Sequence, residues 1–304
     1  MKKTSLQAPA FALVNGELVP WEDARLHVSC EAVNRGLSVF EGIKGYWHLD
    51  GSFGILALPQ HYYRLCQSAR LLHIPFPWTL EEFESCVVTL TKSLLTPEND
   101  LWIRATLFVV EGHWGENTRA DLIMTAYQSG KQLQSSIKLG ISAWQRSSDN
   151  ALSYRIKSAA NYQVARLARI EGRARQCEEM ILLNQWGRVA EATGAAVLIV
   201  RNGALLTPSS AEGALESITI DIIEVVANSL GVKFVRRPVD RTELLVADEL
   251  CICGTLAELI PVEKVDEYMF DSNRPVLETL RDKFNDIVRG VCEDDGVHIT
   301  KLAF

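Results

Sequence analysis

A lysine in unusual surroundings stands at position 157, in the stretch YRIKSAANY (154–162). Small and apolar residues flank Lys157, and no carboxylate lies within four positions on either side to pair with its charge. An amine that loses hydration in such a setting is deprotonated more easily, and a neutral amine is a nucleophile that can form a Schiff base with a carbonyl group. In the ordinary structural interpretation, the lysine stem packs while the ammonium group reaches water.

Three other side chains could take part in catalysis or binding, and each also has an ordinary structural interpretation. Tyr162 lies at the start of a predicted helix, where a packed aromatic is common. Glu191, in RVAEATG, fits a solvated glutamate on a hairpin strand, and Arg64, in HYYRL, fits a surface arginine on an amphipathic helix. Considered one by one, these residues do not decide between the two interpretations.

The seven cysteines are odd in number and form no C-x-x-C pair, a pattern typical of reduced thiols in a cytoplasmic protein. Cys251 and Cys253 alternate in LCICG, and this spacing favours one face of a strand over a metal site. We therefore predict a cytoplasmic protein without a bound metal.

Length and composition limit the classes of protein to which the chain can belong. Its 304 residues are enough for two domains, and its 47% hydrophobic and 23% charged residues are typical of a globular protein. The net charge of −7 argues against a nucleic-acid-binding surface, which needs basic side chains. No apolar stretch reaches the ~18 residues needed to span a bilayer. Residues 1–17 lack the continuous apolar core of a signal peptide.

Turn and cap signals define several of the elements that must position these side chains. Asn15-Gly16 lies between apolar alternations in ALVNGELVP, and Asn202-Gly203 does so in AVLIVRNGALLTP. This dipeptide is the strongest short signal for a β-hairpin. Thr79 is a suitable N-cap for an amphipathic helix at 80–95, and Gly231 is a suitable end for a helix at 218–231.

The order of the elements predicts an α+β fold rather than the regular βαβ alternation of a Rossmann sheet. Further helices are predicted at 59–74, 160–176 and 275–291, further strands at 101–112, 121–127, 137–144, 232–239 and 248–254, and a further hairpin at 180–192. A polar run in the middle of the chain predicts an interdomain linker at 129–136. The linker separates a small N-terminal domain, residues 1–128, from a larger domain, residues 137–304.

Eight stretches, taken in order, resemble fold-type IV pyridoxal-phosphate enzymes, most closely the branched-chain-amino-acid aminotransferases. They are NGELVPWEDARLHVS (15–29), GLSVFEGIKGY (36–46), HYYRL (61–65), IRATLFV (103–109), KSAANYQVARLAR (157–169), ILLNQWGRVAEATG (181–194), ESITIDII (216–223) and CGTLAELIPV (253–262). Each is weakly specific, but together and in order they are very specific. The resemblance implies a D-amino-acid-aminotransferase-like fold, with a small α/β N-terminal domain and a larger domain built on an antiparallel-rich, barrel-like sheet.

The resemblance also implies a set of residues that hold pyridoxal 5′-phosphate. Lys157 matches the lysine that forms the Schiff base and carries the proton between the substrate Cα and C4′ of the cofactor. Glu191 matches the carboxylate that keeps the pyridine nitrogen protonated. The other matches are Arg64, Ile218, Thr219 and Thr255 at the phosphate, Leu215 on the ring face and Tyr162 near the 3′-oxygen.

Substrate recognition departs from the pattern of the family. The residues at substrate positions are Phe40, Trp102, Arg104, Leu256 and, from a neighbouring subunit, Arg35. Trp102 and Arg104 are two apart on one strand and so share a face. Trp102 and Arg35 stand where branched-chain aminotransferases usually have tyrosines, and Ala196 stands where they have an asparagine. These changes do not match specificity for valine, leucine and isoleucine, although Arg35 could equally be a surface arginine.

We therefore expect a pyridoxal-phosphate-dependent aminotransferase that moves an amino group between an amino acid (branched-chain, otherwise hydrophobic, or glutamate) and a 2-oxo acid. The family usually works as a homodimer that shares residues between active sites, so at least a dimer is expected. Alternatives of the same fold are a D-amino-acid or (R)-amine transaminase, a 4-amino-4-deoxychorismate lyase and a non-catalytic binding protein. NYQVARLAR argues against the lyase, and the combination of lysine, glutamate and arginine argues against the binding protein.

Overall fold

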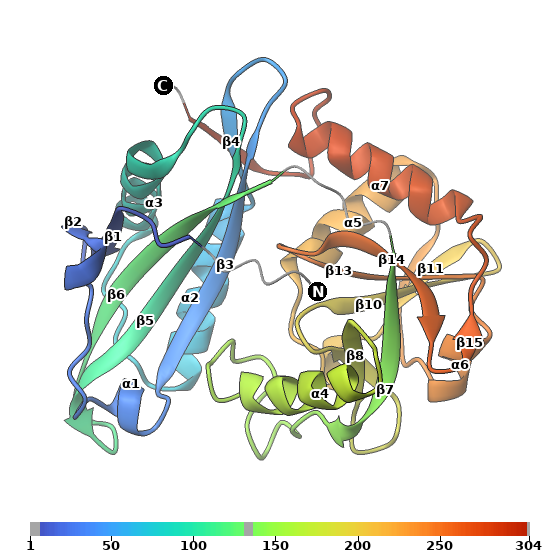
Figure 1. The fold of residues 1–304 in the computed structure, drawn as a ribbon, viewed down its shortest axis with the longest axis horizontal. Helices are drawn as coiled ribbons and strands as arrows, with labels where there is room; N and C mark the ends of the chain where they lie inside the picture. Colours follow the sequence, from blue (N-terminus) through green and yellow to red (C-terminus); the bar gives the residue numbers. More distant parts are fainter. Residues whose placement is uncertain (1–6, 131–135, 303–304) are drawn as a thin grey trace.

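The computed structural model describes residues 7–130 and 136–302 and contains two sheets that face each other across the molecule (Figure 1). Within the described residues, the first sheet has seven strands. They are β1 (Phe11–Val14), β2 (Glu17–Pro20), β3 (Ser38–Trp47), β4 (Phe53–Leu56), β5 (Asp100–His113), β6 (Glu116–Ser129) and β16 (Ile299–Leu302). Their order across the sheet is β16-β4-β3-β5-β6-β1-β2, so the last strand of the described residues pairs with β4, near the beginning of the chain.

The second sheet has nine strands in the described part of the chain. They are β7 (Ile137–Gln145), β8 (Glu179–Leu183), β9 (Val189–Ala192), β10 (Ala196–Arg201), β11 (Ala204–Thr207), β12 (Phe234–Arg236), β13 (Glu249–Gly254), β14 (Glu258–Val265) and β15 (Tyr268–Met269). Most neighbours run antiparallel, while β7 is parallel to both β8 and β14, and β11 to β12. The antiparallel-rich α+β architecture expected from the sequence is confirmed.

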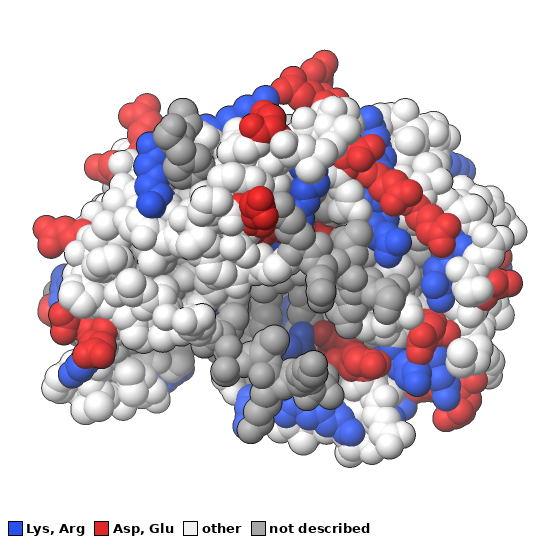
Figure 2. All heavy atoms as spheres, turned by 45° about the horizontal axis from the view of Figure 1, so that its top comes forward, with Lys and Arg blue, Asp and Glu red and all other residues white. Residues whose placement is uncertain are grey.

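Helices cover both sheets. They are α1 (Glu31–Asn34), α2 (Leu58–Leu71), α3 (Leu80–Leu94), α4 (Tyr162–Ala174), α5 (Ile218–Ser229), α6 (Arg241–Leu245) and α7 (Pro275–Val288), with short 3-10 turns η1 (Trp21–Asp23) and η2 (Ser210–Glu212). The apolar faces of α2 and α3 share one buried cluster with the first sheet, and α5 and α7 share another with β10 and β13. Figure 2 shows acidic and basic side chains interspersed over one face of the molecule. In the part of the chain that the structure describes, no helix combines the length and apolarity required of a membrane span.

The two Asn-Gly hairpins and the Thr79 N-cap occur where the sequence predicts them. Both Asn-Gly pairs connect hairpin strands in the left-handed conformation, with φ of 49° and 93° at Asn15 and Gly16 and of 49° and 75° at Asn202 and Gly203. The Thr79 side chain accepts from the backbone N–H of Glu82, whose carboxylate accepts from the backbone N–H of Thr79. This capping box satisfies two donors that the start of α3 would otherwise leave free.

Strands β3, β4, β14, β15 and β16 were not predicted. The central strand β3 is buried along most of its length, including Glu41 and Lys44, so it lacks the alternation that marks a half-exposed strand. The division into two domains stays a prediction, and residues 131–135 of the predicted linker lie outside the described residues.

A buried ion pair ties the first sheet to the last helix. Asp100 is fully buried and accepts from Arg289 Nη1 and Nη2 at 2.5 and 2.8 Å, and from the backbone N–H of Trp47 at 3.0 Å. Arg289 follows α7, so the pair connects β5 with the second half of the chain.

We predict that Asp100→Asn lowers the free energy of unfolding by about 3 kcal/mol, because Arg289 loses its buried counter-charge. Denaturant unfolding of the purified protein measures this change. Glu293→Gln is the matched control, since it breaks a pair with Lys301 in which both side chains are exposed, and it should change stability little. Equal stability of Asp100→Asn and wild type would show that the pair does not hold α7 to the sheet.

Candidate active site

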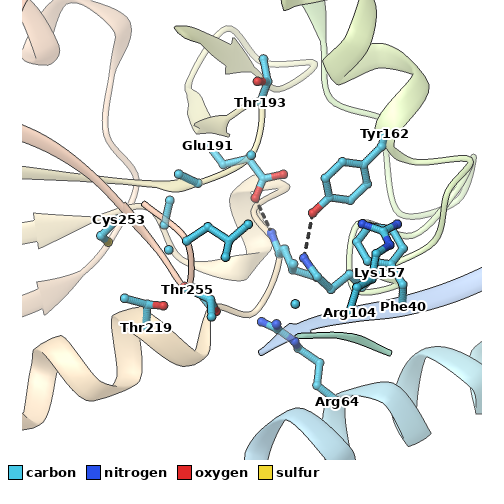
Figure 3. Close-up of a pocket in the computed structure, with 18 of the residues that line it drawn as sticks. Phe40, Arg64, Arg104, Lys157, Tyr162, Glu191, Thr193, Thr219, Cys253 and Thr255 are labelled. Carbon is cyan, nitrogen blue, oxygen red and sulfur yellow. Dashed lines mark hydrogen bonds between the residues drawn. The ribbon is translucent and has the colours of Figure 1, made fainter. Parts of the chain in front are cut away.

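A cavity of about 300 Å³ lies between the two sheets (Figure 3). One wall comes from β3, β5 and α2, and the other from β9, the start of α5 and the turn between β13 and β14. The residues predicted from the sequence that line it are Phe40, Arg64, Trp102, Arg104, Lys157, Tyr162, Glu191, Leu215, Thr219, Thr255 and Leu256. Segments separated by more than a hundred residues in the sequence therefore converge on one site.

Lys157 is held in the cavity through both its backbone and its side chain. Its backbone N–H donates to Ser68 Oγ at 3.0 Å, and its carbonyl accepts from the backbone N–H of Phe40 at 2.9 Å. Lys157 Nζ donates to the phenol oxygen of Tyr162 at 2.8 Å. The same nitrogen lies 5.1 and 5.2 Å from the ring centroids of Phe40 and Tyr162, so two aromatic rings border the amine.

The loop that carries Lys157 is shaped by Asn161. This buried amide donates to the carbonyl oxygens of Ser153 and Ile156 at 2.9 and 2.8 Å. Just after the lysine, Ser158 forms a β-bridge with Val39 on the central strand. The loop is thus fixed to β3 immediately before α4 begins at Tyr162.

Arg64 is clamped by a buried carboxylate. Its Nε and Nη2 donate to Glu41 Oε1 and Oε2 at 2.7 and 2.8 Å, and its Nη1 donates to the carbonyl oxygen of Glu216 at 2.7 Å. His61 Nδ1 lies 2.7 Å from Glu41 Oε2. Burial alone would raise the pKa of the Glu41 carboxyl, but Arg64 and His61 together hold that pKa well below its usual range. Burial lowers the pKa of His61, which favours the neutral ring, and with Nδ1 protonated that ring donates to Glu41.

The N-terminus of α5 faces the same part of the cavity. Ser217 is its N-cap, and the Ser217 hydroxyl accepts from the backbone N–H of Ile220 at 3.3 Å. No described residue accepts a hydrogen bond from the backbone N–H of Ile218 or Thr219. Ser217, Thr219 and Thr255 all line the space, and Thr219 and Thr255 lie next to each other (Figure 3). Free N–H groups at a helix start, together with hydroxyls and a guanidinium, suit an anion.

Glu191 lies at the other end of the cavity, on β9. Its Oε1 is 3.0 Å from Arg146 Nε, and its Oε2 accepts from the backbone N–H of Leu215 at 2.9 Å. Arg146 is buried and also donates to the carbonyl oxygen of Gly213 at 3.2 Å. A carboxylate has about four acceptor positions, so Glu191 can accept a further hydrogen bond from the cavity.

The wall of β5 carries a guanidinium that no described residue neutralises. Arg104 lies with its Cζ 3.8 Å from the centroid of the Phe40 ring, and it has neither an ion pair nor a hydrogen bond to any residue in 7–130 or 136–302. Burial lowers the pKa of Arg104, which nevertheless remains charged. Trp102, on the same face, packs against Tyr127 with centroids 5.3 Å apart, and Ala196 and Leu256 line the cavity beyond.

Two predicted residues have side chains that do not line this cavity. Ile218 contributes at most its backbone. Arg35 follows α1, pairs with Glu31 Oε1 at 2.9 Å and stacks over Trp114 at 4.6 Å. Its predicted approach to a substrate would come from a second copy of the chain, and it stays a prediction.

Sequence reasoning missed the residues that support the site, above all Glu41, His61, Ser68 and Arg146. Their partners are distant in sequence, since Glu41 is 23 residues from Arg64 and Ser68 is 89 residues from Lys157. One available signal was Glu41 itself, a carboxylate in the apolar strand sequence SVFEGI, where burial requires a counter-charge.

Known proteins resemble this chain in both sequence and fold. The family model "Amino-transferase class IV" matches residues 38–265. A probable branched-chain-amino-acid aminotransferase of Synechocystis is 32% identical over 89% of this chain and 90% of its own length.

Solved structures share the fold closely. The branched-chain aminotransferase of Thermoproteus uzoniensis, crystallised with norvaline, is 30% identical with a TM-score of 0.89, over 93% of this chain and 95% of its own. A second branched-chain amino acid aminotransferase, complexed with N-(5′-phosphopyridoxyl)-L-glutamate, is 28% identical with a TM-score of 0.88, over the same shares. The family match spans most of the chain, and the relatives align with nearly all of it. The chain therefore belongs to the class IV aminotransferases and is a pyridoxal-phosphate-dependent enzyme.

Proposed function

We propose that the cavity is the active site, and that it moves an amino group between glutamate and a 2-oxo acid with a bulky apolar side chain. The observation that carries this proposal is the unneutralised Arg104 guanidinium, placed beside the Lys157 amine and over the Phe40 ring. The relatives are branched-chain aminotransferases, so the lyase, the D-amino-acid or (R)-amine transaminase and the non-catalytic protein are not favoured.

The groups around the cavity fit the polar ends of pyridoxal phosphate. Arg64, the start of α5 and Thr255 suit the phosphate. Glu191 suits the pyridine nitrogen at the other end, and the amine of Lys157 lies between the two. Leu215 supports one ring face and Tyr162 lies near the 3′-oxygen. When bound, the cofactor supplies an electron sink for the carbanion formed at the substrate Cα.

The protein side chains hold and move protons around that sink. Lys157 Nζ is proposed to carry the proton between the substrate Cα and C4′ of the cofactor. Tyr162 orients this nitrogen through the 2.8 Å hydrogen bond. Glu191 keeps the proton on the pyridine nitrogen, and Arg146 together with the Leu215 N–H fixes the direction of its carboxylate.

We predict that borohydride reduction of the enzyme fixes the cofactor on Lys157, because it is the only lysine among the described residues that lines the cavity. Peptide mapping by mass spectrometry identifies the modified lysine. Lys157→Ala should abolish turnover while the exposed-lysine variant Lys138→Ala retains it. A cofactor adduct on any other lysine would refute the assignment.

We predict that Glu191→Gln slows abstraction of the Cα proton about a hundred-fold, equivalent to roughly 3 kcal/mol of barrier, because the ring nitrogen loses the charge that keeps it protonated. Single-turnover absorbance of the cofactor measures this step, and cofactor affinity should change far less.

The control for this prediction is Arg146→Gln, which also breaks the Glu191–Arg146 ion pair but leaves the carboxylate in place. It should slow the same step much less than Glu191→Gln. Equal rates in the two variants would mean that the ion pair matters and the contact with the ring nitrogen does not.

Substrate recognition is proposed to combine one carboxylate site with an apolar wall. Arg104 offers a charge-assisted site for a carboxylate, and Phe40 and Trp102 provide the wall. The solved complex of a relative with N-(5′-phosphopyridoxyl)-L-glutamate supports glutamate as the donor. The replacements at Trp102, Arg35 and Ala196 support a bulky apolar partner over small branched ones.

We also propose that the enzyme is at least a homodimer and is cytoplasmic. Val28, Val33 and Trp114 are exposed, with 73, 52 and 76% of their surface accessible, and Trp114 lies against Arg35; such apolar side chains suit an interface with a second copy. All seven cysteines are free, which supports a reducing compartment.

We predict that Arg35→Ala and Arg104→Gln lower kcat/KM with glutamate at least ten-fold more than with leucine, equivalent to roughly 1.4 kcal/mol, because only glutamate has a second carboxylate. Donor kinetics with one common 2-oxo acid measure the selectivity. Arg119→Ala removes an exposed arginine of the same sheet and should leave selectivity unchanged. Equal losses with both donors would exclude the mutated arginine from recognising the second carboxylate.

A further inference from the structure

A buried ion pair joins the two sheets beside the cavity. Lys44 Nζ, from β3, donates to Glu258 Oε1, at the start of β14, over 2.6 Å. Only 6% of Lys44 and 8% of Glu258 is exposed. Neither belongs to the described residues that line the cavity, so the pair has no direct part in the proposed chemistry.

Glu258 closes the turn that carries two cavity residues. It pairs with Gly254 across the β13–β14 hairpin, and Thr255 and Leu256, which lie between them, line the cavity. Glu258 has a φ of 52°, in the left-handed region, although it is not a glycine. Such a conformation persists where the surroundings hold it, and the ion pair to Lys44 is a side-chain contact that restrains Glu258 here.

In the first sheet, Lys44 lies on the face of β3 that borders the site. Phe40, Gly42 and Lys44 alternate along the strand and so point to the same side. Phe40 and Gly42 line the cavity, and the Phe40 backbone N–H donates to the carbonyl of Lys157. One strand therefore holds the Lys157 loop near one end and the 255–257 turn near the other.

An ion pair is a costly way to join two buried surfaces. Apolar side chains of similar size would give equal or greater stability, because both charges must be stripped of water. The ion pair instead fixes geometry. Its short hydrogen bond sets the position of the Glu258 side chain and therefore of the turn.

We propose that Lys44 and Glu258 are positioning residues, which hold the 255–257 turn so that the Thr255 hydroxyl reaches the phosphate of the cofactor. The inference rests on the proposed role of Thr255. Without the ion pair, the turn is free to relax, and the phosphate loses one hydrogen bond while the ring contacts remain.

The test compares binding of pyridoxal phosphate and of pyridoxal, which lacks the phosphate, to the apoenzyme. Lys44→Met/Glu258→Gln removes both charges and leaves neither stranded. We expect it to bind pyridoxal phosphate about ten-fold more weakly, the loss of one hydrogen bond to a charged group, and pyridoxal as tightly as wild type. Arg237→Met/Glu243→Gln is the control, since it removes an ion pair whose members do not line the cavity, and it should leave the ratio of the two affinities unchanged.

Thr255→Val separates this inference from the assignment on which it rests. We expect it to weaken pyridoxal phosphate binding to the same extent, and to cause no further loss when it is combined with the double variant. If Thr255→Val weakens binding but Lys44→Met/Glu258→Gln does not, or if the two losses add, the positioning role is refuted while the role of Thr255 stands. If Thr255→Val binds like wild type, the assignment of Thr255 itself is wrong.

A conservative variant covers the case in which the double variant does not fold, as judged by circular dichroism. Glu258→Asp keeps the charge but shortens the side chain, so the turn must shift to keep its contact with Lys44. It should lose several-fold in affinity for pyridoxal phosphate relative to pyridoxal. A wild-type ratio in this folded variant would overturn the proposal.

Discussion

The bidentate ion pair between Glu41 and Arg64 is the constraint on which the site depends. An isolated buried charge is far too costly to persist, so Glu41 on the central strand requires the guanidinium of α2, and α2 must pack where Arg64 can reach it. The third nitrogen of Arg64 then donates to the carbonyl of Glu216, just before α5. A single cation thereby ties a strand and a helix of the first sheet to the helix start that faces it, and it lies on the cavity between them.

A common arrangement governs the charged groups of the cavity. An ion pair with Glu41 fixes the orientation of Arg64, and an ion pair with Arg146 fixes that of Glu191. Both side chains face the cavity. Lys157 is directed by the phenol of Tyr162, and no carboxylate of the described residues pairs with its amine. Within residues 7–130 and 136–302, Arg104 lies over the Phe40 ring and has no ion pair. The groups with fixed partners are those proposed to bind the resident cofactor, and the cation without one is proposed to meet the substrate, which comes and goes.

Elements whose causes are local were predictable from the sequence, and elements whose causes are distant were not. The Asn-Gly hairpins and the Thr79 capping box depend on residues within a few positions, and they occur where predicted. Strand β3 was missed because its charged residues are compensated by α2 and by Glu258, 214 residues away from Lys44. Strand β16 was missed because its partner, β4, lies near the other end of the chain.

The same distinction applies to the site. Asn161 and Tyr162 shape the lysine loop from within nine positions, but it was family resemblance that identified Lys157 and the other positions that converge on it. Arg146 and Ser68 could not be inferred from the sequence, since nothing near them indicates that they hold Glu191 and Lys157. Arg35 represents a third case. Within one chain, Arg35 forms an ion pair with Glu31, and its guanidinium lies over the Trp114 ring. The proposed role of Arg35 in substrate recognition therefore depends on a second copy of the chain, and in that proposal substrate preference is set partly by assembly rather than by the fold of one chain.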